Sequence, residues 1–160
     1  MPQHPYSPHN INNMIQTIAI GCDHAGYIYK DLIAARLKER GIQVLNFGAD
    51  SAESVDYPDF AHPVADAVEQ GDAQMGIVLC GTGNGVAMTA NKHQGIRAAL
   101  CWTEDVARLV RQHNDANVLA IPARFVNETL ALAMVEIFIE TPFEGGRHER
   151  RVNKIASDPK

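Results

Sequence analysis

Short apolar runs alternate with amphipathic stretches along nearly the whole chain, and this alternation limits the possible folds more than any other feature. Five runs have the length and character of strands: residues 15–20, 44–47, 75–79, 98–101 and 118–121. The run 75–79 is apolar throughout, as expected of a strand buried on both faces. Apolar residues at helical spacing follow these runs, at residues 32–37, 60–68, 86–92, 104–112 and 128–139. The alternation predicts an α/β fold, a doubly wound, Rossmann-like parallel sheet of about five strands with helices on both faces.

The length of the chain suits one domain. With 160 residues, 46% of them hydrophobic, it can bury a core of its own but is too short for two ordinary domains. We expect a single domain over residues 15–156, preceded by a flexible N-terminal extension over residues 1–14. The first thirteen residues lack the charged start and apolar centre of a secretory signal, and no apolar run is long enough to span a membrane.

Charge and cysteine usage narrow the classes of partner. With 14 basic and 19 acidic residues the formal net charge is −5, which disfavours nucleic-acid binding because that binding depends on neutralising phosphates. Arg147 and Arg151 lie four residues apart in a basic segment, so on a helix they share a face and could clamp a phosphate. A solvated surface is the competing interpretation. Three cysteines make no disulfide framework, so we expect a reduced, cytoplasmic protein.

Cys80 is the strongest candidate for chemistry. It follows an apolar run and precedes the sequence Gly-Thr-Gly-Asn-Gly (81–85), which opens a predicted helix. Backbone N–H groups in such a loop favour negative charge, so we expect them to lower the pKa of the thiol, as suits a base or nucleophile. The same N–H groups could stabilise an enediolate; a tight strand-to-helix turn is the alternative. The loop lacks the ending of a P-loop and the spacing of a dinucleotide fingerprint.

Two further pairs of polar residues lie at the ends of predicted elements. Asp23 and His24 follow the first apolar run, at the same predicted edge as Cys80, although Asp23 could simply be a helix N-cap. His113 and Asn114 end the fourth predicted helix, where a histidine often only complements the helix dipole. Cys22 and Cys101 fit better as small buried side chains.

Metal-ligand spacing is absent from the sequence. There is no CxxC or HExxH, and the histidines include His62 and His93, for which we see no ligand partner at helical or hairpin spacing. We therefore expect neither a metal nor a cofactor.

Six segments together resemble one known family. They are GCDHAG (21–26), DYPDFA (56–61), CGTGNG (80–85), ANKHQGIRAA (90–99), RQHNDANVLA (111–120) and EGGRHERRV (144–152). In this order they are similar to ribose-5-phosphate isomerase B, part of a wider family that includes the subunits of galactose-6-phosphate isomerase. The resemblance covers about residues 18–155.

The resemblance implies metal-free interconversion of ribose 5-phosphate and ribulose 5-phosphate. Cys80 matches the base that moves a proton between carbons 1 and 2 through an enediolate. Thr82 matches a residue that helps to transfer hydroxyl protons, and His113 matches the acid that opens the furanose ring. The positions that match substrate-binding residues are Asp23, His24, Tyr57, Gly81, Gly83, Asn84, Gly85, Asn114, Arg124, Arg147 and Arg151. One branch of the family has a glutamate after the glycine loop instead of the cysteine; Val86 stands there, so this chain matches the cysteine branch.

The resemblance also implies a homodimer, or a pair of dimers, in which each site is built from two subunits. Three points stay open at this level. The substrate could be a hexose 6-phosphate, such as allose or galactose 6-phosphate, because one extra carbon changes the pocket more than the motifs. The fold alone would allow a nucleotide-binding or signalling module, but Cys80 stands where a receiver domain needs an acidic residue. Arg150 competes with Arg151 as the residue that faces the phosphate.

Overall fold

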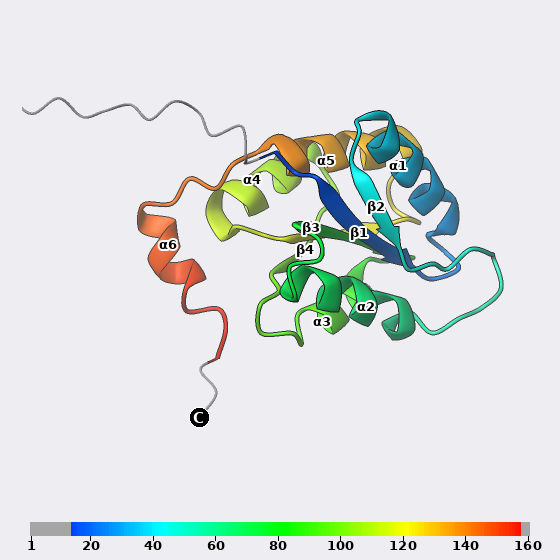
Figure 1. Cartoon of the computed structure of the whole chain (residues 1–160), viewed down its shortest axis with the longest axis horizontal. Coiled ribbons are helices and arrows are strands. Elements are labelled where there is room, and N and C mark those ends of the chain that lie inside the picture. Colours follow the sequence, from blue (N-terminus) through cyan, green and yellow to red (C-terminus); the bar gives the residue numbers. More distant parts are fainter. Residues whose placement is uncertain (1–13, 158–160) are drawn as a thin grey trace, which may run out of the picture.

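Five parallel strands form one sheet at the centre of the computed structural model, which describes residues 14–157 (Figure 1). The strands are β1 (Thr17–Cys22), β2 (Gln43–Asn46), β3 (Met75–Cys80), β4 (Ala98–Leu100) and β5 (Val118–Pro122), and their order in the sheet is β2-β1-β3-β5-β4. Every residue of β3 and β5 is buried, as the apolar runs predict for strands covered on both faces.

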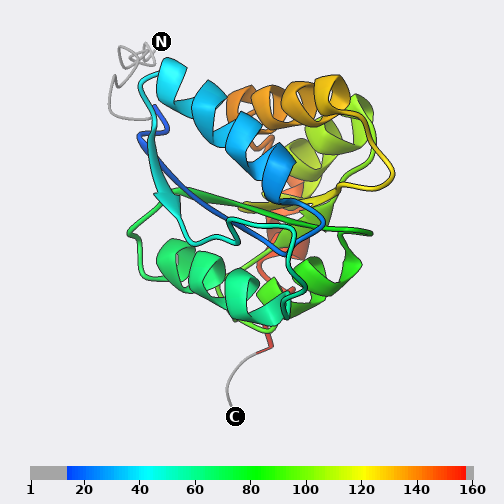
Figure 2. The same cartoon turned by 90° about the vertical axis from the view of Figure 1, so that its right-hand side faces the viewer.

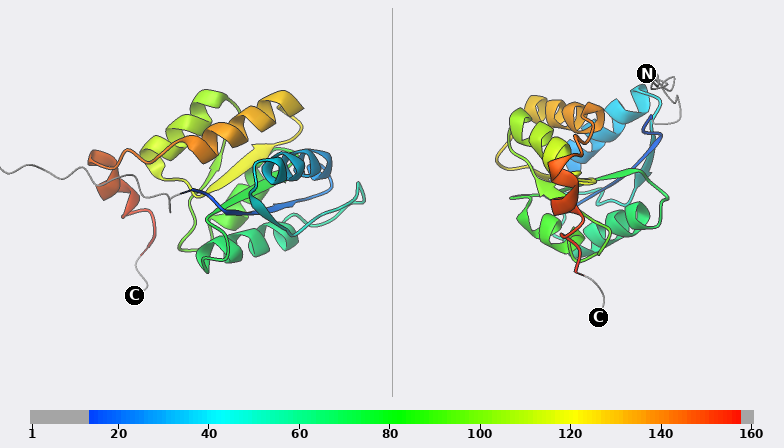
Figure 3. Two further views of the ribbon diagram at one scale, coloured as in Figure 1. Left: turned by 45° about the horizontal axis from the view of Figure 1, so that its top comes forward. Right: turned by 90° about the vertical axis from the view of Figure 1, so that its left-hand side faces the viewer.

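Helices cover both faces of this sheet (Figure 2). One face carries α1 (Tyr27–Glu39), α4 (Glu104–Asn114) and α5 (Glu128–Glu140), and the other carries α2 (Pro58–Glu69) and α3 (Asn84–Ala90). The predicted doubly wound α/β architecture is therefore confirmed. The short helix α6 (Arg147–Val152) stands at one end of the molecule and contacts α4 (Figure 3).

The alternation of side chains along β3 decides where Cys80 points. Ile77 and Leu79 pack in the cluster on the α1, α4 and α5 side, whereas Val78 and Cys80 pack in the cluster on the α2 and α3 side. Cys80 is thus directed toward the helix that its own glycine-rich loop begins.

Helix ends follow their local signals with one exception. Gly41 and Gly71 have positive φ angles of 77° and 83° just after α1 and α2, as expected of glycines that stop helices. The hydroxyl of Thr103 accepts a hydrogen bond from the Val106 N–H at 3.2 Å and caps α4. The predicted third helix is shifted: α3 begins at Asn84, two residues before the expected start, because Gly83 adopts a left-handed conformation and turns the chain into the helix directly.

The predicted N-terminal extension, residues 1–14, lies outside the described residues except for Met14. Within residues 14–157, no helix has the length and apolar character needed to cross a membrane.

Candidate active site

The carboxyl ends of β1, β3 and β5 bring one set of predicted site residues to the same edge of the sheet. Cys80 pairs in register with Pro122 of β5, and the backbone N–H of Asp23 donates to the carbonyl of Leu79 at 3.2 Å. Arg124 follows β5 by two residues, and its backbone N–H donates to the carbonyl of Gly81 at 3.0 Å. Ligands in open parallel sheets bind beyond the carboxyl ends of the strands, so this edge is the expected place for a site.

Cys80 lies in this edge as a buried residue, 5% exposed, held by its own loop. The backbone N–H of Gly83 donates a hydrogen bond to the Cys80 Sγ at 3.2 Å, which requires the left-handed φ of 73° that Gly83 adopts. A side chain at Gly83 would also meet Leu100, since an added Cβ would lie 2.4 Å from Leu100 Cδ1. Thr82 and Asn84 are exposed on the loop, and the Asn84 N–H donates to the Thr82 Oγ1 at 3.3 Å.

Two side chains lie against the glycine-rich loop: Tyr57 contacts Gly85, and Arg124 contacts Gly81. An added Cβ at Gly85 would lie 2.6 Å from the ring of Tyr57, and one at Gly81 would lie 3.2 Å from the guanidinium group of Arg124. Both glycines therefore allow a close approach that a larger residue would prevent. The structure brings Tyr57 and Arg124 to opposite ends of the loop that begins at Cys80.

Asp23 and His24 are held by local hydrogen bonds. The Asp23 Oδ1 accepts from the Ala25 N–H at 2.9 Å, an Asx turn, whereas the N-cap of α1 is Gly26; the interpretation of Asp23 as an N-cap is therefore wrong. The Val55 N–H donates to the His24 Nδ1 at 3.3 Å, so a neutral His24 carries its proton on Nε2.

The second set of predicted site residues lies at the opposite edge. His113 and Asn114 end α4 just before β5 begins, and α6 carries the exposed Arg147 and Arg151. The ring of His113 stacks on that of His148, with centroids 4.3 Å apart and planes tilted by 12°. Burial and the charges of His113, Arg147 and Arg151 lower the pKa of His148, against the opposing charge of Glu144.

The two sets do not meet within one chain. Val118 is in register with Gly76, four residues before Cys80, and Asn114 lies further back along the same direction. At about 3.3 Å per residue, the two edges are separated by more than about 13 Å. In Figure 1, β1 runs toward the right of the picture while α6 lies at the far left. Within one chain, Cys80 and the helix that carries Arg147 therefore lie at opposite edges of the sheet.

Each edge has a cavity beside it. One of about 480 Å³ adjoins the glycine-rich loop, and it is lined by Thr82, Asn84, Leu100, Trp102, Pro122 and Phe125. Trp102 and Phe125 are 54% and 73% exposed, which is unusual for large apolar side chains on one surface. The other cavity, of about 350 Å³, is lined by Asn114 and Arg97 and by residues 155–157, among others.

The other two cysteines behave as small core residues. Cys22 and Cys101 are fully buried, and burial raises the pKa of each to about 12. All three cysteines are free.

Two groupings escaped the sequence analysis. His148 was not singled out, although its place beside His113 follows from the contact of α6 with α4. His93 does have partners: its Nδ1 lies 3.3 Å from carboxylate oxygens of Asp66 and Glu69, and its Nε2 lies 2.8 Å from His62 Nδ1. These partners are 24 to 31 residues away in the chain, so local spacing could not reveal them.

The chain is similar to proteins of known family over nearly its whole length. A model of the family "Ribose/Galactose Isomerase" matches residues 18–155. Ribose-5-phosphate isomerase B of Escherichia coli (strain K12) is 47% identical over 143 residues, which cover 89% of this chain and 96% of that protein. A putative sugar phosphate isomerase of Bacillus subtilis (strain 168) is 41% identical over 140 residues, covering 87% of this chain and 94% of that protein.

Solved structures agree with these matches. Ribose-5-phosphate isomerase B of Clostridium thermocellum aligns with a TM-score of 0.86 and 51% identity, covering 88% of this chain and 95% of that chain. The corresponding enzyme of Mycoplasma genitalium, solved with bound ribulose-5-phosphate, aligns with a TM-score of 0.85 and 44% identity, covering 89% and 95%.

Proposed function

The chain belongs to the ribose/galactose isomerase family, and from this premise we propose that it interconverts ribose 5-phosphate and ribulose 5-phosphate with Cys80 as the base. The observation that carries the proposal is the extent of the family match, which spans every proposed site residue from Asp23 to Arg151. The geometry around Cys80 agrees with that role, because the backbone N–H of Gly83 donates a hydrogen bond to its sulfur at the start of the glycine-rich loop.

The reaction begins with opening of the furanose ring. The bond between carbon 1 and the ring oxygen breaks, His113 gives a proton to that oxygen, and the hydroxyl on carbon 1 loses its proton to solvent. An open-chain aldehyde results. Asn114, the next residue along α4, holds a sugar hydroxyl during this step.

Proton transfer between carbons follows. The Cys80 thiolate takes the proton from carbon 2, and the electron pair of that bond forms the carbon–carbon double bond of the enediolate. The Cys80 thiol, whose proton exchanges in part with solvent, then gives a proton to carbon 1, while the hydroxyl proton on oxygen 2 moves to oxygen 1 with the help of Thr82. A ketone remains at carbon 2. The N–H groups of the loop from Gly81 to Gly85 stabilise the enediolate oxygens, which is the role that a flexible glycine backbone suits.

The phosphate is bound by arginines. Arg147 and Arg151 lie four residues apart on α6, so they share one face of this helix, and the charges of both act on His148. This favours Arg151 over Arg150 as the partner of Arg147 on the face toward α4. Arg124, which lies beside Gly81 at the edge that carries Cys80, is a third arginine of the site.

A complete site needs two copies of the chain, arranged as a homodimer or a pair of dimers. The separation of Cys80 from His113 within one chain supports this arrangement, because the proposed reaction needs both residues at one small molecule. The exposed Trp102 and Phe125 beside the glycine-rich loop offer an apolar surface for a second copy to cover. We also infer a reducing, cytoplasmic location, in keeping with three free cysteines.

The test is proton NMR of ribose 5-phosphate in deuterated water, with ribose, allose and galactose phosphates compared side by side. We expect ketose formation with deuterium entering at carbon 2 of the aldose, fastest with the five-carbon substrate. A folded protein that isomerises only hexose 6-phosphates would keep the reaction type but refute the substrate.

A further inference from the structure

Asp115, which directly follows His113 and Asn114, has an unusual backbone conformation. Its φ and ψ angles are 45° and 44°, and it is the only non-glycine residue with positive φ within residues 14–157. A residue with a Cβ is disfavoured in this left-handed region and stays there only when its surroundings hold it. The turn that ends α4 is therefore maintained by specific contacts of Asp115.

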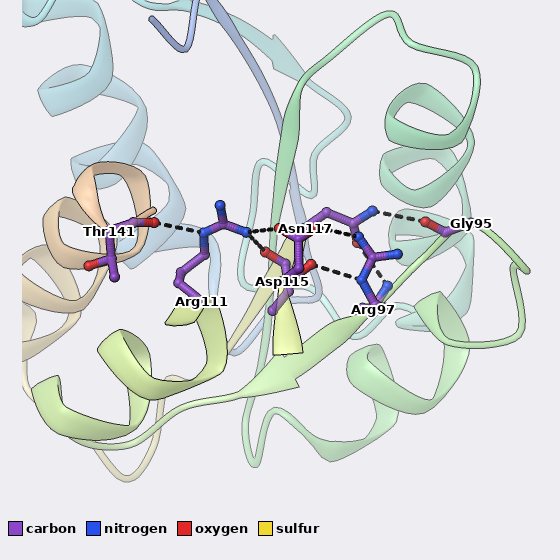
Figure 4. A network of polar contacts seen from close by, with 7 residues as sticks. Gly95, Arg97, Arg111, Asp115, Asn117 and Thr141 are labelled. Carbon is purple, nitrogen blue, oxygen red and sulfur yellow. Dashed lines mark hydrogen bonds and ion pairs between the residues drawn. The ribbon is translucent and has the colours of Figure 1, made fainter. Parts of the chain in front are cut away.

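Two arginines supply these contacts (Figure 4). The Asp115 Oδ1 accepts from Arg111 Nη1 at 3.0 Å, and its Oδ2 accepts from Arg97 Nη2 at 3.3 Å. The backbone carbonyl of Asp115 also accepts from Arg97 Nε at 2.8 Å. Both carboxylate oxygens and the carbonyl are thus engaged by charged donors, which form stronger hydrogen bonds than neutral ones.

Each arginine is itself anchored to a different part of the fold. Arg111 is 9% exposed; it donates to the carbonyls of Ala116 at 2.5 Å and Thr141 at 3.2 Å, and it lies over the ring of Phe138 at 5.6 Å. Arg111 therefore ties the turn to the end of α5.

Arg97 is anchored on the other side, next to β4. Its backbone N–H donates to Asn117 Oδ1 at 2.8 Å, and Asn117 Nδ2 donates to the carbonyl of Gly95 at 2.8 Å. The Asp115 clamp, as we call Asp115 with Arg97 and Arg111, joins the end of α4 to α5, β4 and β5. Such a junction leaves the backbone before Asp115 little freedom.

This junction fixes His113 and Asn114, the two residues that the proposed ring opening uses at this edge. Asn114 and Arg97 line the same cavity of about 350 Å³, and His113 stacks on His148 of α6. We propose that Asp115 is a positioning residue for ring opening: through its two arginines it holds His113 and Asn114 in place for the furanose. This inference rests on the proposed function.

A comparison of two reactions separates this role from simple stability. Ribose 5-phosphate must open its ring before carbon 2 can be deprotonated. Ribulose 5-phosphate cannot close to a five-membered ring, because the oxygen on its carbon 5 carries the phosphate, so exchange of its carbon 1 proton with solvent needs Cys80 but no ring opening. Loss of the clamp should slow the first reaction and spare the second.

The variant Asp115→Gly removes the carboxylate while keeping a residue that readily adopts positive φ, so the turn can still form. We expect at least a tenfold lower kcat for ribose 5-phosphate and carbon 1 deuterium exchange of ribulose 5-phosphate within twofold of wild type. Asp115→Asn keeps one acceptor oxygen and tolerates the same backbone conformation. Its kcat for ribose 5-phosphate should lie between those of wild type and Asp115→Gly. Asp105→Asn removes an exposed carboxylate paired with Arg108 on the same helix and should match wild type in both reactions.

Equal losses in the two reactions for Asp115→Gly, or no loss in either, would overturn the positioning role. If Asp115→Gly fails to fold, Asp115→Asn carries the same comparison, and equal slowing of its two reactions would be just as decisive. A wild-type protein that performs neither reaction would refute the proposed function itself, which the same NMR spectra reveal before any variant is made.

Discussion

The backbone N–H of Gly83 points at the sulfur of Cys80, 3.2 Å away, inside a loop whose backbone only a glycine adopts easily. This hydrogen bond comes from the peptide backbone, so it persists in variants that change neither residue. It places a donor beside the sulfur, and it fixes the sulfur at the carboxyl end of β3, a strand that is buried along its whole length. Donors fixed in advance of reaction are the most effective way to stabilise charge in an active site.

Replacement of the sulfur tests the base directly. Cys80→Ala should lower kcat for ribose 5-phosphate by about 10²–10⁴-fold, the usual contribution of a general base. The fold should survive, since the side chain is small and the loss of its packing costs on the order of 1 kcal/mol. The measurements are NMR turnover in deuterated water and thermal unfolding. Cys22→Ala is the matched control, because that cysteine is also buried at a strand end; near-normal turnover by Cys80→Ala would refute the base assignment.

Thiol reactivity should distinguish the three cysteines. Burial raises the pKa of Cys22 and Cys101 to about 12, so at pH 8 only about one molecule in 10⁴ carries either thiolate. Iodoacetamide should therefore label Cys80 alone in the folded protein, and saturating ribose 5-phosphate should slow that labelling. Peptide mass mapping gives the site. Comparable labelling of Cys22 in the native protein would contradict the expected selectivity, and unfolded protein, labelled at all three positions, is the positive control.

The fold could be predicted from the sequence because apolar periodicity reports burial directly. The runs that became β3 and β5 are buried on both faces, and their limits were predicted to within one residue. The first strand was placed two residues too early, at 15–20 in place of Thr17–Cys22, since apolar Ile15 extends the run while Cys22, as buried as the isoleucines, reads as part of the following turn. Element limits depend on contacts from distant segments, such as the bond from the Thr17 N–H to the Gln74 side chain.

The site was less accessible to sequence reasoning. Cys80 and its loop could be identified because strand, thiol and glycines are adjacent in the chain. Tyr57 was assigned to the site only from the family resemblance, and its contact with Gly85 was not predicted. The Asp115 clamp depends on Arg97, 18 residues away. Contacts of that kind form when whole elements pack, and no local period encodes them.

From the contact between Tyr57 and Gly85 we predict an effect on substrate binding. An added methyl group at Gly85 would lie 2.6 Å from the Tyr57 ring, so Gly85→Ala must displace that ring. We expect KM for ribose 5-phosphate to rise by roughly tenfold, about 1.4 kcal/mol, with a smaller change in kcat. Tyr57→Ala removes the obstacle, so adding Gly85→Ala to it should change KM by less than about twofold. Independent, additive effects of the two substitutions would show that the ring is not what the methyl group meets.

The histidine stack at the other edge predicts a dependence of stability on pH. Burial and the charges of His113, Arg147 and Arg151 lower the pKa of His148, with Glu144 opposing them. A histidine whose pKa is lower in the folded than in the unfolded chain favours folding when neutral, so its contribution is present above about pH 6.5 and declines as pH falls through that value.

Thermal unfolding between pH 8 and pH 5 measures this effect. His148→Gln cannot be protonated, so its Tm should fall less steeply than that of wild type below about pH 6.5, with parallel curves above pH 7. Subtracting the two curves cancels the titration of other groups. A variant whose Tm falls as steeply as that of wild type would mean that His148 protonation does not oppose folding.

Mixing two inactive variants tests whether each site is shared between chains. Cys80→Ala damages the edge at the ends of β1, β3 and β5, and His113→Ala damages the opposite edge. In a mixed dimer of the two, one site carries both substitutions and the other carries neither.

Refolding an equimolar mixture should give mixed dimers in about half of the molecules, and so restore about a quarter of the wild-type kcat per chain, although each variant alone is nearly inactive. If both residues acted within one chain, every site would stay damaged and mixing would restore nothing. Light scattering on the same samples gives the number of chains per particle, and a monomer that retains full activity would refute the shared site.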